Sequence, residues 1–276
     1  MRVSFQGALG AFSEEAVRLL VPDADPIPRT SFEAVVRAVE EGADSAGVVA
    51  VENTLAGAVV EAYEALAAGS VTVVGEAAIP IRHCLLGVAG ASIEALKEAT
   101  SHPVALSQCR GFFAAHPHIL ARAVYDTAGA AEEVARVGDP EVAAIASERA
   151  GERYGLSNLL RDLQDRDDNQ TRFYLIVRDA EPPPAEGGLK TACIAELENR
   201  PGVLHDLLGV FANRGLDLTH VASRPGGTPW TYRFIIEFRH ETLDECRLAV
   251  EDATRLGARI RVLGTFSAWS PGPPPS

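Results

Sequence analysis

A hydroxyl and a guanidinium stand side by side where a polar segment of the chain passes into an apolar one. The segment consists of Asp167, Asp168, Asn169, Gln170, Thr171, Arg172 and Phe173, and apolar residues continue to Val177. A strand that opens with Thr171 and Arg172 would bring a hydrogen-bond donor and a bidentate cation to the rim of a sheet, where an anionic substrate can be held. Taken alone, the segment is better explained as an ordinary strand start, so the case rests on other segments with the same chemistry.

A second polar group follows an apolar strand predicted at 47–51. Glu52, Asn53 and Thr54, with Gly57 close behind, supply a carboxylate, an amide and a hydroxyl. Ligands of open α/β sheets bind at the carboxyl ends of strands, which is where these residues are expected. They suit a polar substrate, although Thr54 alone fits a helix N-cap nearly as well.

Further candidates are Ser101, His102 and Gln108, which combine a possible cap, an imidazole and an amide at a helix entry. A histidine satisfied within a turn is the ordinary alternative. The glycine turn at 7–10 lacks the third glycine of a dinucleotide site, because Phe12 occupies that position, but it could present backbone N–H groups to a small anion. No G-x-S-x-G nucleophile elbow exists, so acyl transfer has no support from the sequence.

Composition narrows the function further. The net charge of −13 argues against non-specific nucleic-acid binding, so an anion site needs local positive potential from arginines or helix N-termini. Only two lysines, Lys97 and Lys190, are available for Schiff-base chemistry. No apolar run of about 18 residues predicts a membrane span, and the N-terminal residues have no leader-like apolar run, which favours a cytoplasmic location.

Metal and disulfide sites are not expected. The four cysteines are far apart without a CxxC pair, and they are Cys84, Cys109, Cys193 and Cys246. His116 and His118 could form part of a metal site, but no third ligand lies nearby, so a solvated turn is favoured. The sequence therefore predicts neither a zinc site nor a disulfide framework.

Strands and helices alternate before residue 179. Strands are predicted at 3–6, 47–51, 142–147 and 171–177, with two more apolar runs in 71–88 separated by Pro80. Helices are predicted at 13–20, 32–41, 59–68, 92–99, 106–115 and 128–137, the first with Ser13 as its N-cap. This rhythm predicts an α/β unit with a largely parallel sheet.

A linker is predicted at 180–189, where three prolines precede two glycines. Beyond it, strands at 190–198, 216–223, 231–239 and 259–266 and helices at 203–213 and 243–254 give the ferredoxin-like order β-α-β-β-α-β. Residues 269–276, rich in Pro and Gly, are predicted to be a disordered tail. Since the linker separates two self-sufficient patterns, residues 1–179 alone are expected to fold and to be active.

Five ordered motifs together resemble the prephenate dehydratase family in its monofunctional bacterial form, from Val3 to about Phe266. The motifs lie at 7–14, 51–54 with Gly57, 101–103 with 108–109, 169–173, and 200–204 with 223–225. The last of these belongs to a unit that resembles an ACT regulatory domain. The resemblance covers almost the whole chain, and the order of five motifs is far more specific than any one of them.

The resemblance implies an α/β catalytic domain at 1–179 with two lobes like those of a type II periplasmic binding protein. One lobe would comprise about 1–78 plus 168–179 and the other 79–167, with an ACT domain at 190–268. The implied reaction is decarboxylation of prephenate with loss of its ring hydroxyl, which gives phenylpyruvate for phenylalanine biosynthesis. The resemblance implies that this reaction requires no metal and no organic cofactor. Arogenate dehydratase is the runner-up within this enzyme class, and a non-catalytic amino-acid-sensing binding protein is the alternative from another class.

Roles for individual residues follow from the resemblance. Thr171 would donate to the departing hydroxyl, Arg172 would pair with a substrate carboxylate or hold the loop, and Phe173 would pack beneath the site. The residues expected to line the substrate are Glu52, Asn53, Thr54, Gly57, Ser101, His102, Gln108, Thr127 and Asn169.

Regulation is expected at the second unit. Phenylalanine would bind between ACT domains of neighbouring subunits in a homodimer or homotetramer, at Pro201, Gly202, Val203, Leu204, Ser223 and Arg224. Three positions depart from the family pattern, since Thr54 and Asp126 stand where serine is common and Ala222 where the regulatory motif usually has glutamate. Ala222 is therefore expected to give weaker or altered inhibition.

Overall fold

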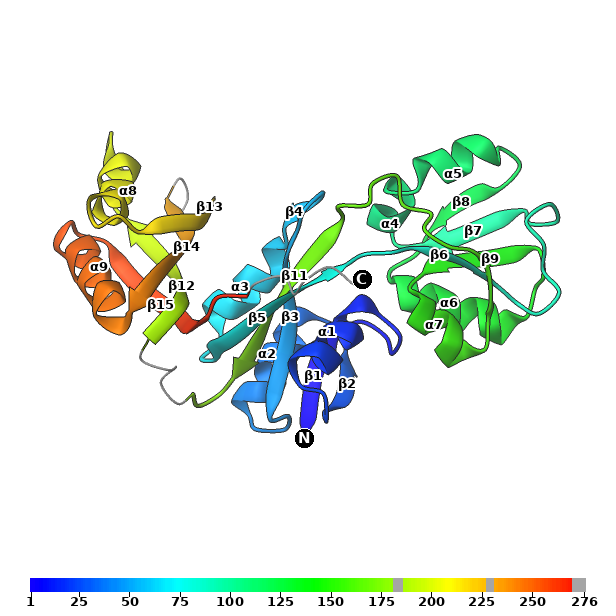
Figure 1. Ribbon diagram of the computed structural model, residues 1–276, viewed down its shortest axis with the longest axis horizontal. Helices are drawn as coiled ribbons and strands as arrows, with labels where there is room; N and C mark the ends of the chain where they lie inside the picture. The colour runs from blue at the N-terminus through cyan, green and yellow to red at the C-terminus, as the bar shows by residue number, and fades with distance from the viewer. Residues whose placement is uncertain (181–185, 227–230, 270–276) are drawn as a thin grey trace.

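The computed structural model describes residues 1–180, 186–226 and 231–269, which form three bodies in a row (Figure 1). We call them the C-terminal domain, lobe 1 and lobe 2, with lobe 1 in the middle. Lobe 1 contains β1 (Arg2–Gln6), α1 (Phe12–Leu20), β2 (Asp25–Arg29), α2 (Phe32–Glu40), β3 (Ala46–Asn53), β4 (Gly57–Ala58), α3 (Val60–Ala68), β5 (Thr72–Pro80) and β11 (Gln170–Val177).

Lobe 1 is built on a mixed sheet with the strand order β2-β1-β3-β11-β5, to which β4 adds beside β3. Strand β1 runs parallel to β2 and β3, whereas β11 runs antiparallel to both β3 and β5. Strand β11 enters the sheet on its return from lobe 2, so the sheet is less parallel than the sequence predicts. A bulge between β3 and β11 follows Arg172, and it matters for the site described below.

Lobe 2 is a second sheet with the order β10-β6-β9-β7-β8. Its elements are β6 (Cys84–Gly87), β7 (Glu98–Ser101), α4 (Pro103–Ser107), α5 (Arg110–Ala115), β8 (Leu120–Ala123), α6 (Thr127–Val137), β9 (Val142–Ala146), α7 (Glu148–Tyr154) and β10 (Ser157–Leu160). The chain enters this lobe after β5 and leaves it before β11. Two lobes joined by two crossover segments are the type II periplasmic-binding-protein arrangement that the resemblance implied.

Several elements differ from the sequence prediction. The predicted helix at 92–99 is wrong, because its end belongs to β7, a strand buried between β8 and β9 whose pairing overrides the helix preference of Ala and Glu. Strand β2 was missed because it contains Pro26 and Pro28, which an edge strand paired only with β1 can accept. Strands β8 and β10 and helix α7 were missed as well. Helix α1 begins at Phe12 with no side-chain cap, so Ser13 is not its N-cap.

The predicted helix at 106–115 is divided into α4 and α5. The Asp165 carboxylate accepts hydrogen bonds from the N–H groups of Arg110 (3.0 Å) and Gly111 (2.8 Å), and it thereby caps α5 from the return crossover. Such a cap comes from far along the chain, so local periodicity could not show where α4 ends and α5 begins.

The C-terminal domain has the predicted β-α-β-β-α-β order and an antiparallel sheet β13-β14-β12-β15. Its elements are β12 (Glu186–Leu197), α8 (Val203–Asn213), β13 (Asp217–Pro225), β14 (Tyr232–Thr242), α9 (Leu243–Arg255) and β15 (Arg259–Ser267). Residues 186–189 of the predicted linker therefore belong to β12, and 181–185 lie outside the described residues. Of the predicted tail, Trp269 donates its N–H to Glu76 (3.1 Å), and 270–276 lie outside the described residues.

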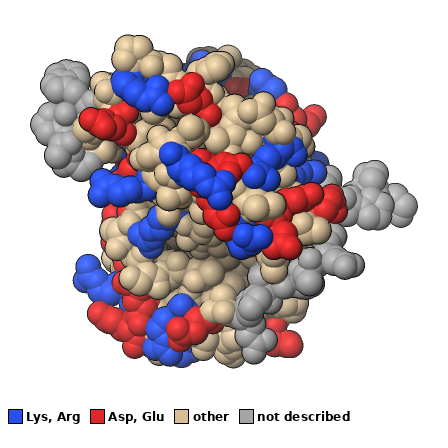
Figure 2. All heavy atoms as spheres, turned by 90° about the vertical axis from the view of Figure 1, so that its left-hand side faces the viewer, with Lys and Arg blue, Asp and Glu red and all other residues tan. Residues whose placement is uncertain are grey.

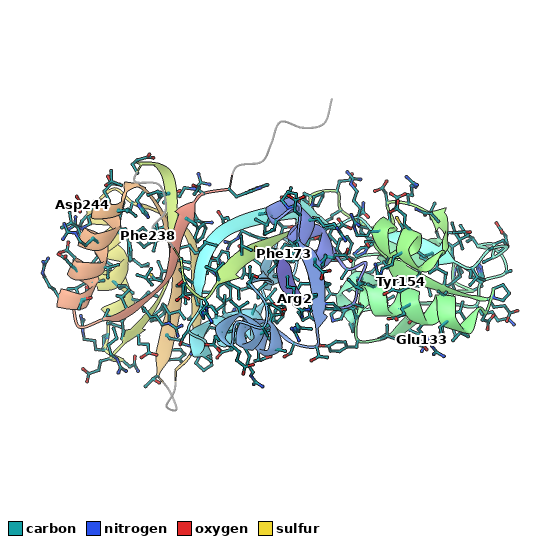
Figure 3. All side chains as sticks on the ribbon, turned by 90° about the horizontal axis from the view of Figure 1, so that it is seen from below. Arg2, Glu133, Tyr154, Phe173, Phe238 and Asp244 are labelled. Carbon is teal, nitrogen blue, oxygen red and sulfur yellow. The ribbon has the colours of Figure 1, made fainter. Side chains whose placement is uncertain are left out.

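Both faces of this sheet are covered. Helices α8 and α9 pack on one face around Phe211 and Phe238. The other face packs on lobe 1, where an apolar cluster joins Tyr174 and Ile176 of β11 to residues of β12, β14 and β15. Figure 3 shows the three bodies from below, with Phe238 in the C-terminal domain and Phe173 in lobe 1.

Strand β15 crosses β5 at close range, because a Cβ added at Gly264 would collide with the backbone of Val73. On the outer end of the C-terminal domain, basic and acidic side chains are interspersed, as Figure 2 shows. Among the described residues, no helix is both long and apolar enough to cross a membrane.

Candidate active site

A cleft with a volume of about 650 Å³ lies between the two lobes. Lobe 1 contributes the start of α1, the start of α2, the end of β3 and the start of β11. Lobe 2 contributes the segment that leads into β6, helix α4 and the start of α6. Seven of the predicted site residues line this cleft, and they are Asn53, Gly57, His102, Gln108, Thr127, Thr171 and Phe173.

Strand pairing brings the central pair together. Thr171 of β11 lies opposite Asn53 of β3, and the Asn53 Nδ2 group donates to the Thr171 Oγ1 atom at 2.9 Å. The Asn53 carboxamide is held in this orientation because its Oδ1 atom accepts from the N–H groups of Leu55 (3.0 Å) and Ala56 (2.9 Å). With an acceptor role toward Asn53, the Thr171 hydroxyl keeps its own hydrogen for a ligand in the cleft.

A chain of amides continues from this pair into lobe 2. The Asn53 Nδ2 group also donates to Asn169 Oδ1 (2.8 Å), and Asn169 Nδ2 donates to Gln108 Oε1 (3.0 Å). His83 Nε2 lies 3.1 Å from the same Gln108 oxygen, which can only accept, so His83 carries its proton on Nε2. Burial lowers the pKa of His83, which favours the neutral ring. This series of hydrogen-bonded side chains spans the crossover segments and connects both lobes to Thr171.

Three predicted lining residues lie behind the cleft surface rather than on it. Ser101 is fully buried and donates to the carbonyl of Ile145 (2.5 Å). Thr54 donates to the carbonyl of Asp168 (3.0 Å) and accepts from the N–H of Gln170 (2.9 Å), which fixes the return crossover against β3. Asn169 is buried and serves as the middle member of the amide chain.

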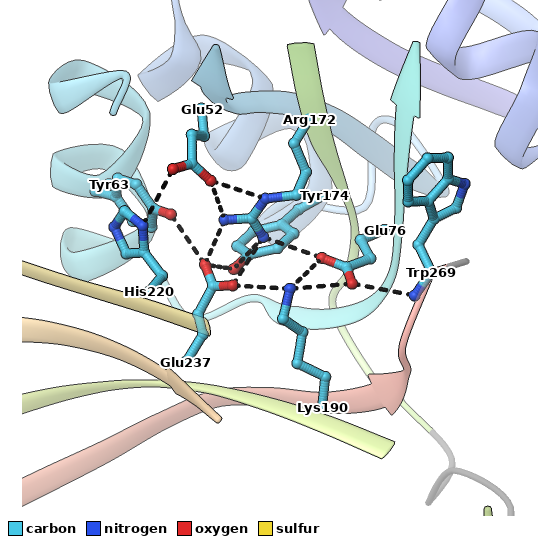
Figure 4. A network of polar contacts seen from close by, with 9 residues as sticks. All are labelled: Glu52, Tyr63, Glu76, Arg172, Tyr174, Lys190, His220, Glu237 and Trp269. Atoms are coloured by element: carbon cyan, nitrogen blue, oxygen red, sulfur yellow. Dashed lines mark hydrogen bonds and ion pairs between the residues drawn. The ribbon is translucent and has the colours of Figure 1, made fainter. Parts of the chain in front are cut away.

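Glu52 and Arg172 face the opposite side of the sheet, toward the C-terminal domain. The Arg172 guanidinium contacts Glu52 (2.8 Å), Glu76 (3.0 Å) and Glu237 (2.8 Å), and its side chain is 13% exposed. Figure 4 shows these contacts, and Arg172 is not among the residues that line the cleft. Strand alternation puts neighbours on opposite faces, so Thr171 and Asn53 reach the cleft while Arg172 and Glu52 reach the domain interface.

Opposite charges hold the carboxylates of this interface ionised. The hydrogen bond from His220, together with Arg172, lowers the pKa of Glu52 to about 2 against the effect of burial. Burial alone would raise the pKa of Glu237, but Arg172 and Lys190 lower it to about 2.

The charged groups that line the cleft differ from those of the domain interface. None of its described lining residues is Lys or Arg, and three are carboxylates, namely Glu33, Glu61 and Asp126. Helices α1, α2, α3 and α6 all present their first turns to it. Helices α1 and α3 have no side-chain cap, so their first N–H groups are available to an anion, whereas Ser31 and Asp126 cap α2 and α6.

His83 and Tyr125 are among the cleft residues that sequence reasoning missed. His83 packs edge-on against Phe12, with ring centroids 5.7 Å apart. Tyr125 reaches from lobe 2 to lobe 1, where its hydroxyl donates to the carbonyl of Thr30 (2.9 Å). Neither lies in a motif that the residue pattern singles out, although a histidine just before an apolar strand could have drawn attention to His83.

The predicted effector residues lie at two places in the C-terminal domain. Gly202 has a φ of 80° and precedes α8, which begins at Val203 without a side-chain cap. Pro201 and Leu204 flank this turn. Ser223 and Arg224 lie at the end of β13, and in the described part of the chain the buried Nε atom of Arg224 has no hydrogen-bond partner. The described residues contain no group of three His, Cys, Asp or Glu side chains that could hold a metal ion.

Fold and site thus define a two-lobed ligand cleft joined to a regulatory-type domain, and comparison with known proteins identifies the family. The prephenate dehydratase family model matches residues 3–181, and the ACT domain model matches residues 191–245. The chain therefore belongs to the prephenate dehydratase family of carbon–oxygen lyases, with an ACT domain.

The chain is also similar to individual proteins of known sequence or structure. Arogenate dehydratase/prephenate dehydratase 2, a chloroplastic protein of Arabidopsis thaliana, is 36% identical over 277 residues, which cover 96% of this chain and 72% of that protein. The structure of prephenate dehydratase from Arthrobacter aurescens in complex with L-Phe has a TM-score of 0.90 at 30% identity, covering 97% of this chain and 90% of that chain. GqqA, described as a novel type of quorum quenching acylase, has a TM-score of 0.88 at 32% identity over 98% of both chains.

Proposed function

We propose that the cleft converts prephenate to phenylpyruvate. The bond between the ring and its carboxylate breaks to release CO₂, and the electron pair of that bond forms a ring double bond. The bond between the ring and its hydroxyl breaks at the opposite carbon, and the departing oxygen takes up one proton to leave as water. The ring becomes aromatic, which supplies the driving force, so the enzyme has to position the substrate and help the oxygen to leave.

The hydrogen bond from Asn53 to the Thr171 oxygen is the observation that carries this proposal. Because that oxygen already accepts a hydrogen bond, the Thr171 hydrogen is directed to the substrate hydroxyl that departs. An aliphatic alcohol is a weak acid, so its role is a hydrogen bond that strengthens as negative charge develops on the leaving oxygen. Phe173 forms the apolar floor beneath it.

Substrate carboxylates are held by helix N-termini in this proposal. The uncapped first turns of α1 and α3 face the cleft, and their free N–H groups favour negative charge. Arg172 takes no part in substrate binding, since its guanidinium is engaged by three carboxylates on the other face of the sheet. It belongs to the support of the site instead.

Arogenate, the aminated analogue, is the second candidate substrate. The carboxylate of Asp126 lines the cleft and suits an ammonium group, and the plant relative carries both activities in its name. An absorbance assay for phenylpyruvate from prephenate, with chromatography of phenylalanine from arogenate, compares the two substrates directly. Release of either product supports the proposed elimination, whereas a folded protein that releases neither would leave only the binding-protein alternative.

Phenylalanine is the proposed effector, in a cytoplasmic homodimer or homotetramer. The relative from Arthrobacter aurescens is in complex with L-Phe. The N–H groups at the start of α8 suit an amino-acid carboxylate, and Gly202 leaves room for its close approach. We expect Ala222→Glu to strengthen inhibition, which calorimetry and inhibition curves on the two proteins would measure. Unchanged curves would remove position 222 from effector binding.

A further inference from the structure

The C-terminal domain contacts the strand pair that carries the proposed catalytic residues. Thr171 and Asn53 are opposite each other on β11 and β3, and the next pair in register is Arg172 and Glu52. The first pair faces the cleft, and the second faces the C-terminal domain. A change in the contacts of Arg172 and Glu52 therefore affects the residues next to Thr171 and Asn53 in the two strands.

Glu237 of β14 supplies the main contact from the C-terminal domain. Its two oxygens lie 2.8 Å from the two terminal nitrogens of Arg172, a bidentate pair, and its side chain is fully buried. The same carboxylate accepts hydrogen bonds from Tyr63 (3.1 Å) and Tyr174. All of its acceptor positions are thus directed at lobe 1 or at the neighbouring lysine.

Two further residues of the C-terminal domain take part in these contacts. Lys190 of β12 lies 3.0 Å from Glu237 and 2.9 Å from Glu76, and it thus joins the two carboxylates on either side of the interface. His220 of β13 lies 3.4 Å from the second oxygen of Glu52. Strands β14 and β13 of the C-terminal domain therefore contact the pair next to Thr171 and Asn53, and Lys190 of β12 supports Glu237 (Figure 4).

We propose that Glu237 is a positioning residue for Thr171, so that the C-terminal domain completes the geometry of the catalytic pair. This inference rests on the proposed function of the cleft. Glu237 fixes the guanidinium of Arg172, Arg172 fixes Glu52, and the two side chains together hold the bulged ends of β11 and β3 in register. Displacement of a catalytic group by about 1 Å can cost on the order of 10² in rate.

Replacement of the carboxylate by an amide tests the proposal. Glu237→Gln should lower kcat by about 10–10² while KM changes by less than about threefold, since the variant leaves the cleft lining intact. Glu237→Asp keeps the charge and should recover part of the loss. Glu64→Gln is the matched control. The ion pair between Glu64 of α3 and Arg233 of β14 also joins lobe 1 to the C-terminal domain, but it does not involve β3 or β11. The kcat of this variant should stay within about twofold of the parent.

A double variant separates positioning from general stability. If Glu237 acts through the Thr171 hydroxyl, Glu237→Gln should cost little further kcat in a Thr171→Ala background. Full additivity would overturn the proposal, and so would an unchanged kcat in a folded Glu237→Gln protein or an equal loss in Glu64→Gln. Should Glu237→Gln fail to fold, His220→Asn releases Glu52 without burying a charge, and the same fall in kcat at constant KM is expected. A parent protein inactive on both substrates would instead refute the proposed function.

Discussion

The two faces of the lobe 1 sheet differ in the groups that interact with charge. On the cleft face, amides, a hydroxyl and helix N-termini are present, and the described lining contains neither Lys nor Arg. On the interface face, Arg172 of β11 and Lys190 of β12 are buried among three carboxylates. The cleft has to bind and release an anion, for which oriented dipoles suffice, whereas the interface pairs its charges permanently. The difference shows why the arginine beside Thr171 need not be a substrate ligand.

The largest effect is expected from removal of the buried guanidinium of Arg172. Arg172→Met leaves Glu52, Glu76 and Glu237 facing one another, and loss of one partner of a buried pair typically costs about 3–5 kcal/mol. Arg200→Met serves as the matched control, because its pair with Asp206 is exposed and should contribute little to stability. Denaturant unfolding of the two variants measures the free energies. A similar small loss in both would show that the interface charges are weakly coupled to the fold.

Docking of the two sheets can be probed without touching a charge. Gly264→Ala places a methyl group against the backbone of Val73, and it should lower the free energy of unfolding by about 1–3 kcal/mol. Gly209→Ala, in the middle of α8, has open space around it and should be neutral or stabilising. Thermal unfolding of both variants would show this contrast. Equal melting temperatures would mean that β5 and β15 do not need their close approach.

Acid should weaken the interface between lobe 1 and the C-terminal domain. The pKa values of Glu52 and Glu237 are about 2 in the folded protein, below the ordinary value of 4.5. Their contribution to stability is therefore complete above pH 4.5 and is lost as the pH falls toward 2. The difference in melting temperature between the parent and Glu237→Gln should shrink over this range. A difference that stays constant down to pH 2 would contradict ionised carboxylates at the interface.

A smaller effect is expected on substrate choice. Asp126→Ser keeps a side chain that can cap α6 but removes a negative charge from the cleft lining. The ratio of kcat/KM for arogenate to that for prephenate should fall by about 10–10², since one charge-assisted hydrogen bond is worth about 1.5–3 kcal/mol. A ratio that does not change would place the ammonium of arogenate elsewhere in the cleft.

The sequence was informative where a motif follows a strand end. Asn53 and Thr171 line the cleft because the end of β3 and the start of β11 meet at the rim of the sheet, and Gln108 lines it from the end of α4. The face on which Arg172 and Glu52 lie was not predictable, since alternation reverses the face at each residue and the bulge adds one more to β3.

Long-range partners were beyond sequence reasoning for a related reason. Glu237 lies 65 residues from Arg172, and no periodicity links them. One signal was present, because Glu237 is a lone carboxylate between Ile236 and Phe238 in an apolar strand, and buried charges are usually paired. The linker suggested that residues 1–179 could act alone. The docked sheet leads to the opposite expectation, since that fragment would expose Tyr174 and Ile176 and leave Arg172 without Glu237.

The central claim, that the Thr171 hydroxyl assists the departing oxygen, is tested most directly by comparing Thr171→Ala with Thr171→Ser. Loss of the hydroxyl should lower kcat by about 10²–10³ with little change in KM, because the hydrogen bond strengthens only in the transition state. Serine keeps the hydroxyl and the acceptor for Asn53 Nδ2, so its kcat should stay within about tenfold of the parent. A folded Thr171→Ala protein with near-normal turnover would contradict the account.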